Sequence, residues 1–219
     1  MTLDGATGPR ASRGRRTSRP TGDDREQAIL ATAVRLLERH ALSEISIDDL
    51  ARGAGISRPT FYFYFRSKDA VLLTLLDRVN EEAVRALADP LDRVAEDPVR
   101  CWRECLAALY TTFHSHRPVL LATAEVRHTN AEVARWCADM MDVWVTRTEQ
   151  AIEAERARGA APPGPGSREL AIVLNAMVDR ALYATFTGDG PAVPAAEVVD
   201  VLLHAWLTSI YQTAEPAPA

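Results

Sequence analysis

Apolar residues recur at spacings of three and four along most of the chain, a periodicity typical of amphipathic helices. Prolines and glycines divide the periodic stretches, notably at Pro90, Pro98 and Pro118 and in the loops 159–167 and 188–194. No segment reads convincingly as a strand, because the alternation in "FYFYF" is flanked by helix caps. The pattern predicts an all-α fold of about nine helices, near 23–40, 46–53, 57–65, 68–88, 98–115, 118–128, 130–158, 167–187 and 194–212.

Two short helices early in the chain carry clear start signals. Ser46 is a good N-cap, with Asp49 three residues later in a near-capping-box position. Ser57 caps the next helix, whose first turn tolerates Pro59 because an N–H there has no partner inside the helix. Gly55, between the two, can adopt a positive φ in a tight turn. Packed on the preceding helix, the pair predicts a three-helix helix-turn-helix unit.

Five of the fourteen aromatic residues form one uninterrupted run, residues 61–65. Phe61 and Phe65 are four apart, so they share a helix face and can fill the core of the three-helix unit. The three rings between them then point partly or wholly away from that core. The alternative is that all five rings pack against the next helix, but five adjacent side chains cannot face one way. Exposed rings beside hydroxyl and cationic side chains indicate a surface that contacts DNA.

Charge is distributed unevenly along a chain whose net charge is −5. Residues 1–22 hold five arginines and one acid, whereas residues 71–219 hold thirteen arginines and twenty-one acids. The first segment is also rich in Gly, Pro, Ser and Thr, so we expect a disordered basic arm. Arg13, Arg15 and Arg16 would let such an arm contact DNA in a neighbouring minor groove. The alternative is a merely solvated tail.

Several classes of protein are disfavoured by composition. No apolar run approaches a membrane span, and the N-terminus lacks the apolar core of a secretory signal. Three cysteines are too few for a disulfide framework, so we expect a cytoplasmic protein without a membrane partner. Cys101 and Cys105, with histidines downstream, could bind a metal, but buried inert thiols are favoured because no tight ligand pair is present. We find no catalytic constellation and no cofactor motif, so we do not expect an enzyme.

The segment "ISIDDLARGAGISRPTFYFYFRSKDAVLLTLL" resembles the TetR family of bacterial repressors. The spacing G-[IV]-S-x-x-T-[LIF]-Y-x-[HY]-F-x-[ST]-K-[DE]-x-[LV] is specific over this length. The resemblance implies an all-α homodimer with a small N-terminal DNA-binding domain and a larger ligand-binding domain. It carries DNA-contact roles to Ser57, Arg58, Pro59, Thr60, Tyr62, Phe63, Tyr64 and Lys68, and it suggests that Ser46 touches a phosphate.

All four tryptophans lie in the C-terminal body, on at least three predicted helices. Any single ring is more simply explained as core packing. Large rings on several helices are nevertheless a plausible lining for an apolar cavity. Met141 joins these rings as a further candidate for the lining. The family members that the chain resembles most enclose a lipophilic tunnel, and the resemblance places Trp102, Phe113, Trp144, Asn175, Tyr183 and Trp206 along it. The chain departs from that pattern at two points: Trp136 is displaced by one residue, with Cys137 at the matching place, and Val178 replaces an asparagine.

Together these features predict a repressor that binds a palindromic operator as a dimer and is released by a small hydrophobic effector. The expected parts are a basic arm (1–22), a helix-turn-helix domain (23–68) and a ligand-binding and dimerisation domain (69–219). The effector would favour a state whose DNA-reading helices are misplaced. The alternatives are a helical carrier or enzyme that encloses an apolar molecule, an activator of the same family, and a sensor of metal or thiol oxidation.

Overall fold

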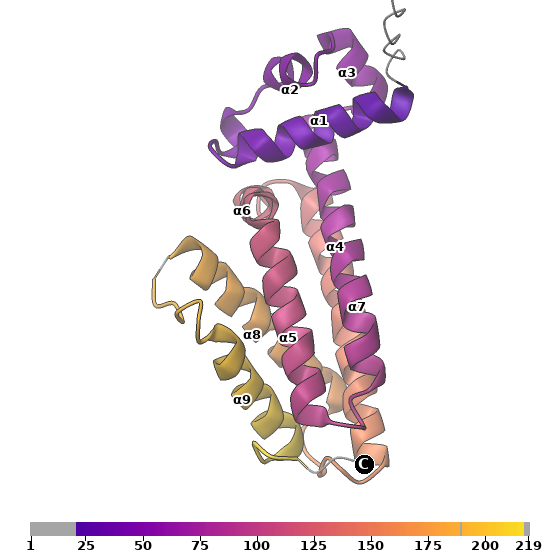
Figure 1. The fold of residues 1–219 in the computed structure, drawn as a ribbon, viewed down its shortest axis with the longest axis vertical. Coiled ribbons are helices and arrows are strands. Elements are labelled where there is room, and N and C mark those ends of the chain that lie inside the picture. Colours follow the sequence, from indigo (N-terminus) through magenta and orange to yellow (C-terminus); the bar gives the residue numbers. More distant parts are fainter. Residues whose placement is uncertain (1–20, 189, 217–219) are drawn as a thin grey trace, which may run out of the picture.

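The computed structural model describes residues 21–188 and 190–216, and the arm residues Arg13, Arg15 and Arg16 lie outside these ranges. Over the described residues the chain is helical, without strands, so the predicted all-α class is confirmed (Figure 1). The helices are α1 (Gly22–Leu37), η1 (Leu42–Glu44, a 3₁₀ turn), α2 (Ile47–Gly53), α3 (Arg58–Tyr64), α4 (Lys68–Asp92), α5 (Pro98–Ser115), α6 (Arg117–Val126), α7 (Ala131–Ala157), α8 (Ser167–Thr187) and α9 (Val198–Tyr211).

The N-terminal helices begin at the caps that their sequences supply. The Ser46 hydroxyl accepts a hydrogen bond from the amide of Asp49, whose carboxylate accepts one in return from the Ser46 amide. Ser57 caps α3 in the expected way, with a proline in the first turn. Gly55 has a φ of +68°, as the turn requires. These local signals fix the helix-turn-helix, which lies across one end of the molecule (Figure 1).

Close packing of α1 against α2 depends on a glycine. A methyl group at Gly53 would lie 2.4 Å from Cγ2 of Thr32, a buried α1 side chain. That separation is well inside van der Waals contact, so the two helices approach through the missing side chain. Ala51, two residues earlier on α2, is also buried.

The long helix α4 joins the two ends of the molecule (Figure 1). The expected break at Pro90 is wrong, because α4 continues through it to Asp92. Pro90 lies in the last turn, where the helix loses only one hydrogen bond. The N-terminal core continues along α4 to Val79 and takes in Val119 and Ala122 of α6. The first half of α4 and helix α6 therefore share the core of the helix-turn-helix.

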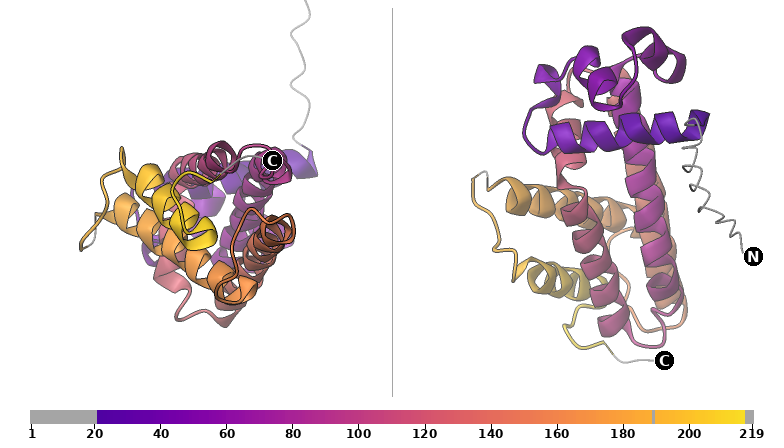
Figure 2. Two further views of the ribbon diagram at one scale, coloured as in Figure 1. Left: turned by 90° about the horizontal axis from the view of Figure 1, so that it is seen from below. Right: turned by 45° about the horizontal axis from the view of Figure 1, so that its top comes forward.

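The body packs α5 between α4 and α9, and α7 against α8 (Figure 2). The predicted ends of α5 and α8 match the structure, whereas α9 begins at Val198 instead of 194. The carbonyl of Pro194 accepts from the amides of Glu197 and Val198, so residues 194–197 form a turn that leads into the helix. Within the described ranges, α8 alone is long and apolar enough to cross a membrane by length and composition, a test that the core helix of a soluble protein also passes.

Candidate functional site

Helix α3 divides its aromatic run between the core and the surface. Phe61 is fully buried and Phe65 is 6% exposed, whereas Tyr62 is 47% and Phe63 84% exposed. Tyr64 is half-buried and packs on the N-terminal core. The prediction that Phe61 and Phe65 fill the core is confirmed, and the alternative in which all five rings pack inward is wrong. The exposed rings leave α3 with an apolar outer face.

The arginines near this face have acidic partners. Arg58 Nη1 lies 2.9 Å from Asp48 Oδ2, and its guanidinium carbon lies 5.9 Å from the centre of the Tyr62 ring. Arg52 pairs with Asp49 at 3.2 Å, and a third ion pair joins Arg66 to Glu132 of α7. These pairs are exposed and therefore weak, so a phosphate could replace the carboxylates.

The hydroxyl groups expected to contact DNA have structural roles in the free protein. Ser46 Oγ donates to Asp49 Oδ2 at 2.6 Å, and these Ser46 hydrogen bonds lower the pKa of the Asp49 carboxyl. Ser57 and Thr60 share a hydrogen bond of 2.8 Å between their hydroxyls. Pro59 is exposed between them. All three hydroxyls thus stabilise the starts of α2 and α3, and their contacts with DNA stay predictions.

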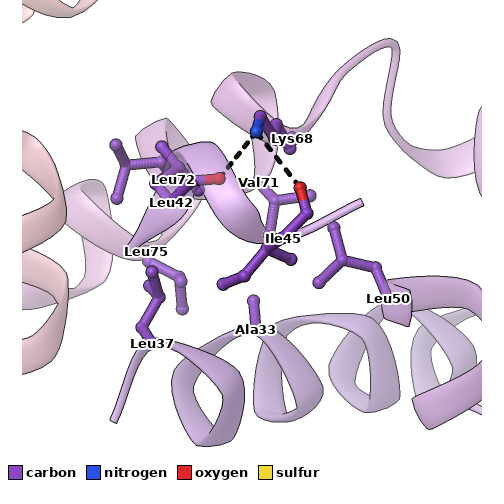
Figure 3. Close-up of a pocket in the computed structure, with 9 residues that line it drawn as sticks. All are labelled: Ala33, Leu37, Leu42, Ile45, Leu50, Lys68, Val71, Leu72 and Leu75. Carbon is purple, nitrogen blue, oxygen red and sulfur yellow. Dashed lines mark hydrogen bonds between the residues drawn. The ribbon is translucent and has the colours of Figure 1, made fainter. Parts of the chain in front are cut away.

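Lys68 has a position that the sequence pattern did not suggest (Figure 3). Its Nζ donates to the carbonyl oxygens of Leu42 at 2.6 Å, Ser43 at 3.2 Å and Ile45 at 3.1 Å. An ammonium has three N–H groups, so all of its donors are used inside the protein. The stem lies over a small apolar cavity of about 10 Å³, enough for one water molecule. A direct phosphate contact, the role inferred for Lys68 from resemblance, would require it to give up these bonds.

Most of the aromatic residues placed in the body meet in one core. Trp102 is 1% and Trp206 3% exposed, and their ring centres lie 5.0 Å apart. Phe113, Met141 and Trp144 pack around this core, half-buried. The two tryptophans come from α5 and α9, which explains why their contact could not be read from spacing. The Nε1 group of Trp206 is buried without a hydrogen-bond partner.

Asn175, Tyr183 and Trp136 make other contacts than the Trp102–Trp206 pair. Asn175 is half-buried, and its amide nitrogen donates to Thr148 Oγ1 at 3.0 Å and to the carbonyl of Ala171 at 2.9 Å. The ring of Tyr183 lies beneath Arg180, 5.7 Å from the guanidinium carbon to its centre. Trp136 faces the N-terminal core and donates from Nε1 to Asp77 Oδ1 at 2.7 Å. Trp136 therefore packs apart from the paired tryptophans.

A buried polar network beside these tryptophans was missed by sequence reasoning. Trp102 Nε1 donates to the Tyr211 hydroxyl at 3.1 Å, and this hydroxyl donates to Glu155 Oε2 at 2.8 Å. Arg158 Nε donates to Glu155 Oε1 at 2.7 Å. Burial, foremost, raises the pKa of the Tyr211 hydroxyl, which stays protonated as a donor. The residues of this network come from α5, α7 and α9 and from Arg158, the residue after α7. No local spacing in the sequence could therefore have indicated the network.

We expect Tyr211→Phe to lower the free energy of unfolding by about 1–3 kcal/mol. It leaves Trp102 Nε1 without a partner and removes one of the two donors to Glu155 Oε2, the other being Arg158 Nη2. Tyr110→Phe is the matched control, because Tyr110 is half-buried at the edge of the same core. Urea unfolding followed by circular dichroism measures both variants. Equal stability of the two would mean that the network contributes nothing.

Burial raises the pKa values of all three thiol groups. Cys101 and Cys105 are buried, as expected, and Cys137 is half-buried. Burial raises the pKa of Cys105 to about 12, which keeps its thiol protonated. Across the residues that the structure describes, no three metal-binding side chains come together.

Comparisons with known proteins agree with this architecture. Residues 29–75 match the family model "Bacterial regulatory proteins, tetR family", and residues 102–212 match "Transcriptional regulator EthR, C-terminal domain". The chain is 52% identical over 212 residues to the HTH-type transcriptional regulator EthR of Mycobacterium tuberculosis (strain ATCC 25618 / H37Rv), covering 96% of this chain and 98% of the relative. It is 45% identical to EthR of Mycolicibacterium smegmatis, covering 95% and 96%.

Solved structures share the fold at low identity. A TetR transcription regulator from Haloarcula marismortui has a TM-score of 0.70 at 16% identity, covering 89% of this chain and all of the other. The TetR family transcriptional regulator PfmR from Thermus thermophilus has a TM-score of 0.64 at 18% identity, covering 83% and 96%. With a helix-turn-helix that presents aromatic rings, and a body that matches EthR, the chain belongs to the TetR family of transcriptional regulators, not to a family of enzymes.

Proposed function

We propose that the protein is a cytoplasmic repressor that binds a palindromic operator as a homodimer and releases it when a small hydrophobic effector binds the body. The observation that carries this proposal is the exposure of Phe63 and Tyr62 on α3, 84% and 47%. Two large exposed rings on one short helix are unusual unless a partner covers them. The relatives at 52% and 45% identity are named as helix-turn-helix regulators, which supports DNA as that partner.

In the proposed complex α3 enters the major groove, where the exposed rings contact thymine methyls and sugars. Arg58 would exchange Asp48 for a phosphate. Arg52, Arg58 and Arg66 each pair with an acid, so in the free protein these three arginines add little uncompensated positive charge beside α3. The basic arm would then supply much of the counterion release on binding.

The proposed dimer uses α8 and α9. Ile172 and Val173 are 47% and 63% exposed on α8, and Val201 is 49% exposed on α9. These helices pack against each other along one side of the protomer (Figure 1). A second copy related by a two-fold axis would cover both apolar faces at once.

The effector would enter among the rings around Trp102 and Trp206. Because these two rings contact each other, its entry requires them to separate. The unpaired Nε1 of Trp206 is a donor that a carbonyl or ether oxygen could satisfy. We therefore propose an apolar, neutral effector with at least one hydrogen-bond acceptor.

DNA binding is tested by fluorescence anisotropy with a duplex from the region upstream of the protein's own gene. We expect specific binding that weakens steeply with salt, and much weaker binding to a scrambled duplex. No preference between the two duplexes over several overlapping segments would contradict the proposal. Thermal stabilisation by apolar compounds without any DNA binding would favour the helical carrier instead.

We expect Val173→Glu to convert the dimer to a monomer at micromolar concentration, because it places a charge in the proposed interface. Operator affinity should fall with it, since each half-site would then bind alone. Analytical ultracentrifugation measures the assembly state, and Ala88→Glu, on the exposed side of α4, is the control. A Val173→Glu protein that remains dimeric would exclude this face.

A further inference from the structure

In the turn between α1 and α2, Glu44 accepts a hydrogen bond from the amide of Ala41, but no local side chain caps the next two amides. The 3₁₀ helix of this turn, η1, begins at Leu42, and Ala41 in the N-cap position makes no side-chain hydrogen bond. The first N–H groups of a helix find no acceptor inside that helix. The amides of Leu42 and Ser43 must therefore be satisfied by water or by another part of the chain.

A carboxylate from the body supplies the missing cap. Glu125, near the end of α6, accepts hydrogen bonds from Leu42 N at 3.0 Å through Oε2 and from Ser43 N at 3.1 Å through Oε1. Burial raises the pKa of Glu125, but the hydrogen bonds from Ser43 and Leu42, with the Lys68 charge, lower it by more. The group is therefore a carboxylate at neutral pH, and both of its oxygens contact η1.

The opposite side of η1 is held by α4. Lys68 binds the carbonyls of Leu42, Ser43 and Ile45, two of which Figure 3 shows. The turn thus lies between an anion on α6 and a cation on α4. Amide and carbonyl groups are both engaged, so η1 cannot move relative to α6 without breaking charge-assisted hydrogen bonds.

Helix α6 also contacts helices of the C-terminal body, so a movement of those helices can be transmitted to it. Val119 and Ala122 are buried in the N-terminal core, and α6 contacts α5 and α8 as well as α1 and α4. Arg127, the C-cap of α6, lies 3.8 Å from Asp179 of α8. A displacement of α8 or α5 that moves α6 would therefore move the carboxylate of Glu125.

We propose that Glu125 is a positioning residue that couples the body to the DNA-reading unit by fixing η1 against α6. It touches neither DNA nor effector and acts through the α1–α2 turn. Its consequence for DNA rests on the proposed function, whereas its effect on η1 does not. The inference predicts two separable results. The local result is the protection of the η1 amides, and the transmitted result is the effect of DNA binding on α6 and α8.

Hydrogen exchange of the full-length protein tests both. In Glu125→Ala, we expect the Leu42 and Ser43 amides to exchange at least tenfold faster, because they lose their acceptor. With the own-gene upstream duplex bound, the wild-type protein should show slower exchange in α6 and α8, and at least half of this transmitted protection should be lost in Glu125→Ala. Glu125→Gln keeps one side-chain oxygen and should fall between.

Glu149→Ala is the matched control, because it removes a body carboxylate that pairs with Arg168 at 3.1 Å, on α7 and α8. It should leave both results unchanged. Unaltered exchange at Leu42 and Ser43 in Glu125→Ala would overturn the inference. The inference would also be overturned if Glu125→Ala exchanged faster at η1 but DNA binding still protected α6 and α8 as fully as in the wild-type protein. If the wild-type protein binds no tested duplex, the proposed function fails, and the local exchange result alone decides whether Glu125 fixes η1.

Discussion

Phe61→Ala should lower the free energy of unfolding by about 3–5 kcal/mol, the cost typical of deleting a fully buried ring. Phe61 is 0% exposed and lies in the N-terminal core with Phe65 and α4 residues such as Val71 and Leu72. The surrounding helices are too closely packed to fill the space. Urea unfolding with a helical signal measures the loss, and DNA binding should fall because less of the domain is folded.

Phe63→Ala is the counterpart on the same helix, two residues away. Phe63 is 84% exposed, so its removal should change stability by about 0.5 kcal/mol or less. If its ring contacts bases or sugars, operator affinity should fall about tenfold, which corresponds to about 1.4 kcal/mol. Anisotropy titrations at one salt concentration compare the two variants at temperatures where both are folded. A Phe63→Ala protein with wild-type affinity would remove this ring from the DNA interface.

Lys68→Met should destabilise the protein by about 2–3 kcal/mol, because three carbonyl oxygens lose a charged donor while the apolar stem is kept. DNA binding should weaken as η1 loosens, yet the dependence of affinity on salt should stay unchanged. A lysine that contacts a phosphate would give the opposite result: intact stability and a salt slope smaller by about one. Thermal unfolding and titrations at several salt concentrations distinguish the two.

Lys68→Arg serves as the control for charge. It keeps the cation, but a planar fork cannot match three converging carbonyls as an ammonium does. We expect the Lys68→Arg protein to have a free energy of unfolding between those of Lys68→Met and the wild type, and a wild-type dependence of DNA affinity on salt. Full recovery of stability would mean that charge alone holds the turn, and a smaller slope in Lys68→Met would restore the phosphate contact originally inferred for it.

The sequence by itself determined the local architecture. Ser46, Ser57 and Gly55 specify where α2 and α3 begin and how the chain turns between them, because caps and positive φ depend on residues a few positions apart. Helical periodicity likewise predicted the all-α class and the four-residue spacing that buries Phe61 and Phe65. The helix break expected at Pro90 is wrong, because a proline disrupts a helix less in its last turn, and the sequence pattern did not show that α4 ends only two residues later.

Only the tertiary structure decided which distant groups meet. Lys68 and Glu125 are charged residues that local spacing presents as surface, yet they hold η1 from two sides across 23–26 and 82–83 positions of sequence. The ring contact between Trp102 and Trp206 and the hydrogen bond from Trp102 to Tyr211 likewise join α5 to α9, which are far apart in the chain. Hydrogen bonds and ring contacts depend on positions to within a few tenths of an ångström, and packing sets these positions, whereas periodicity specifies only a face.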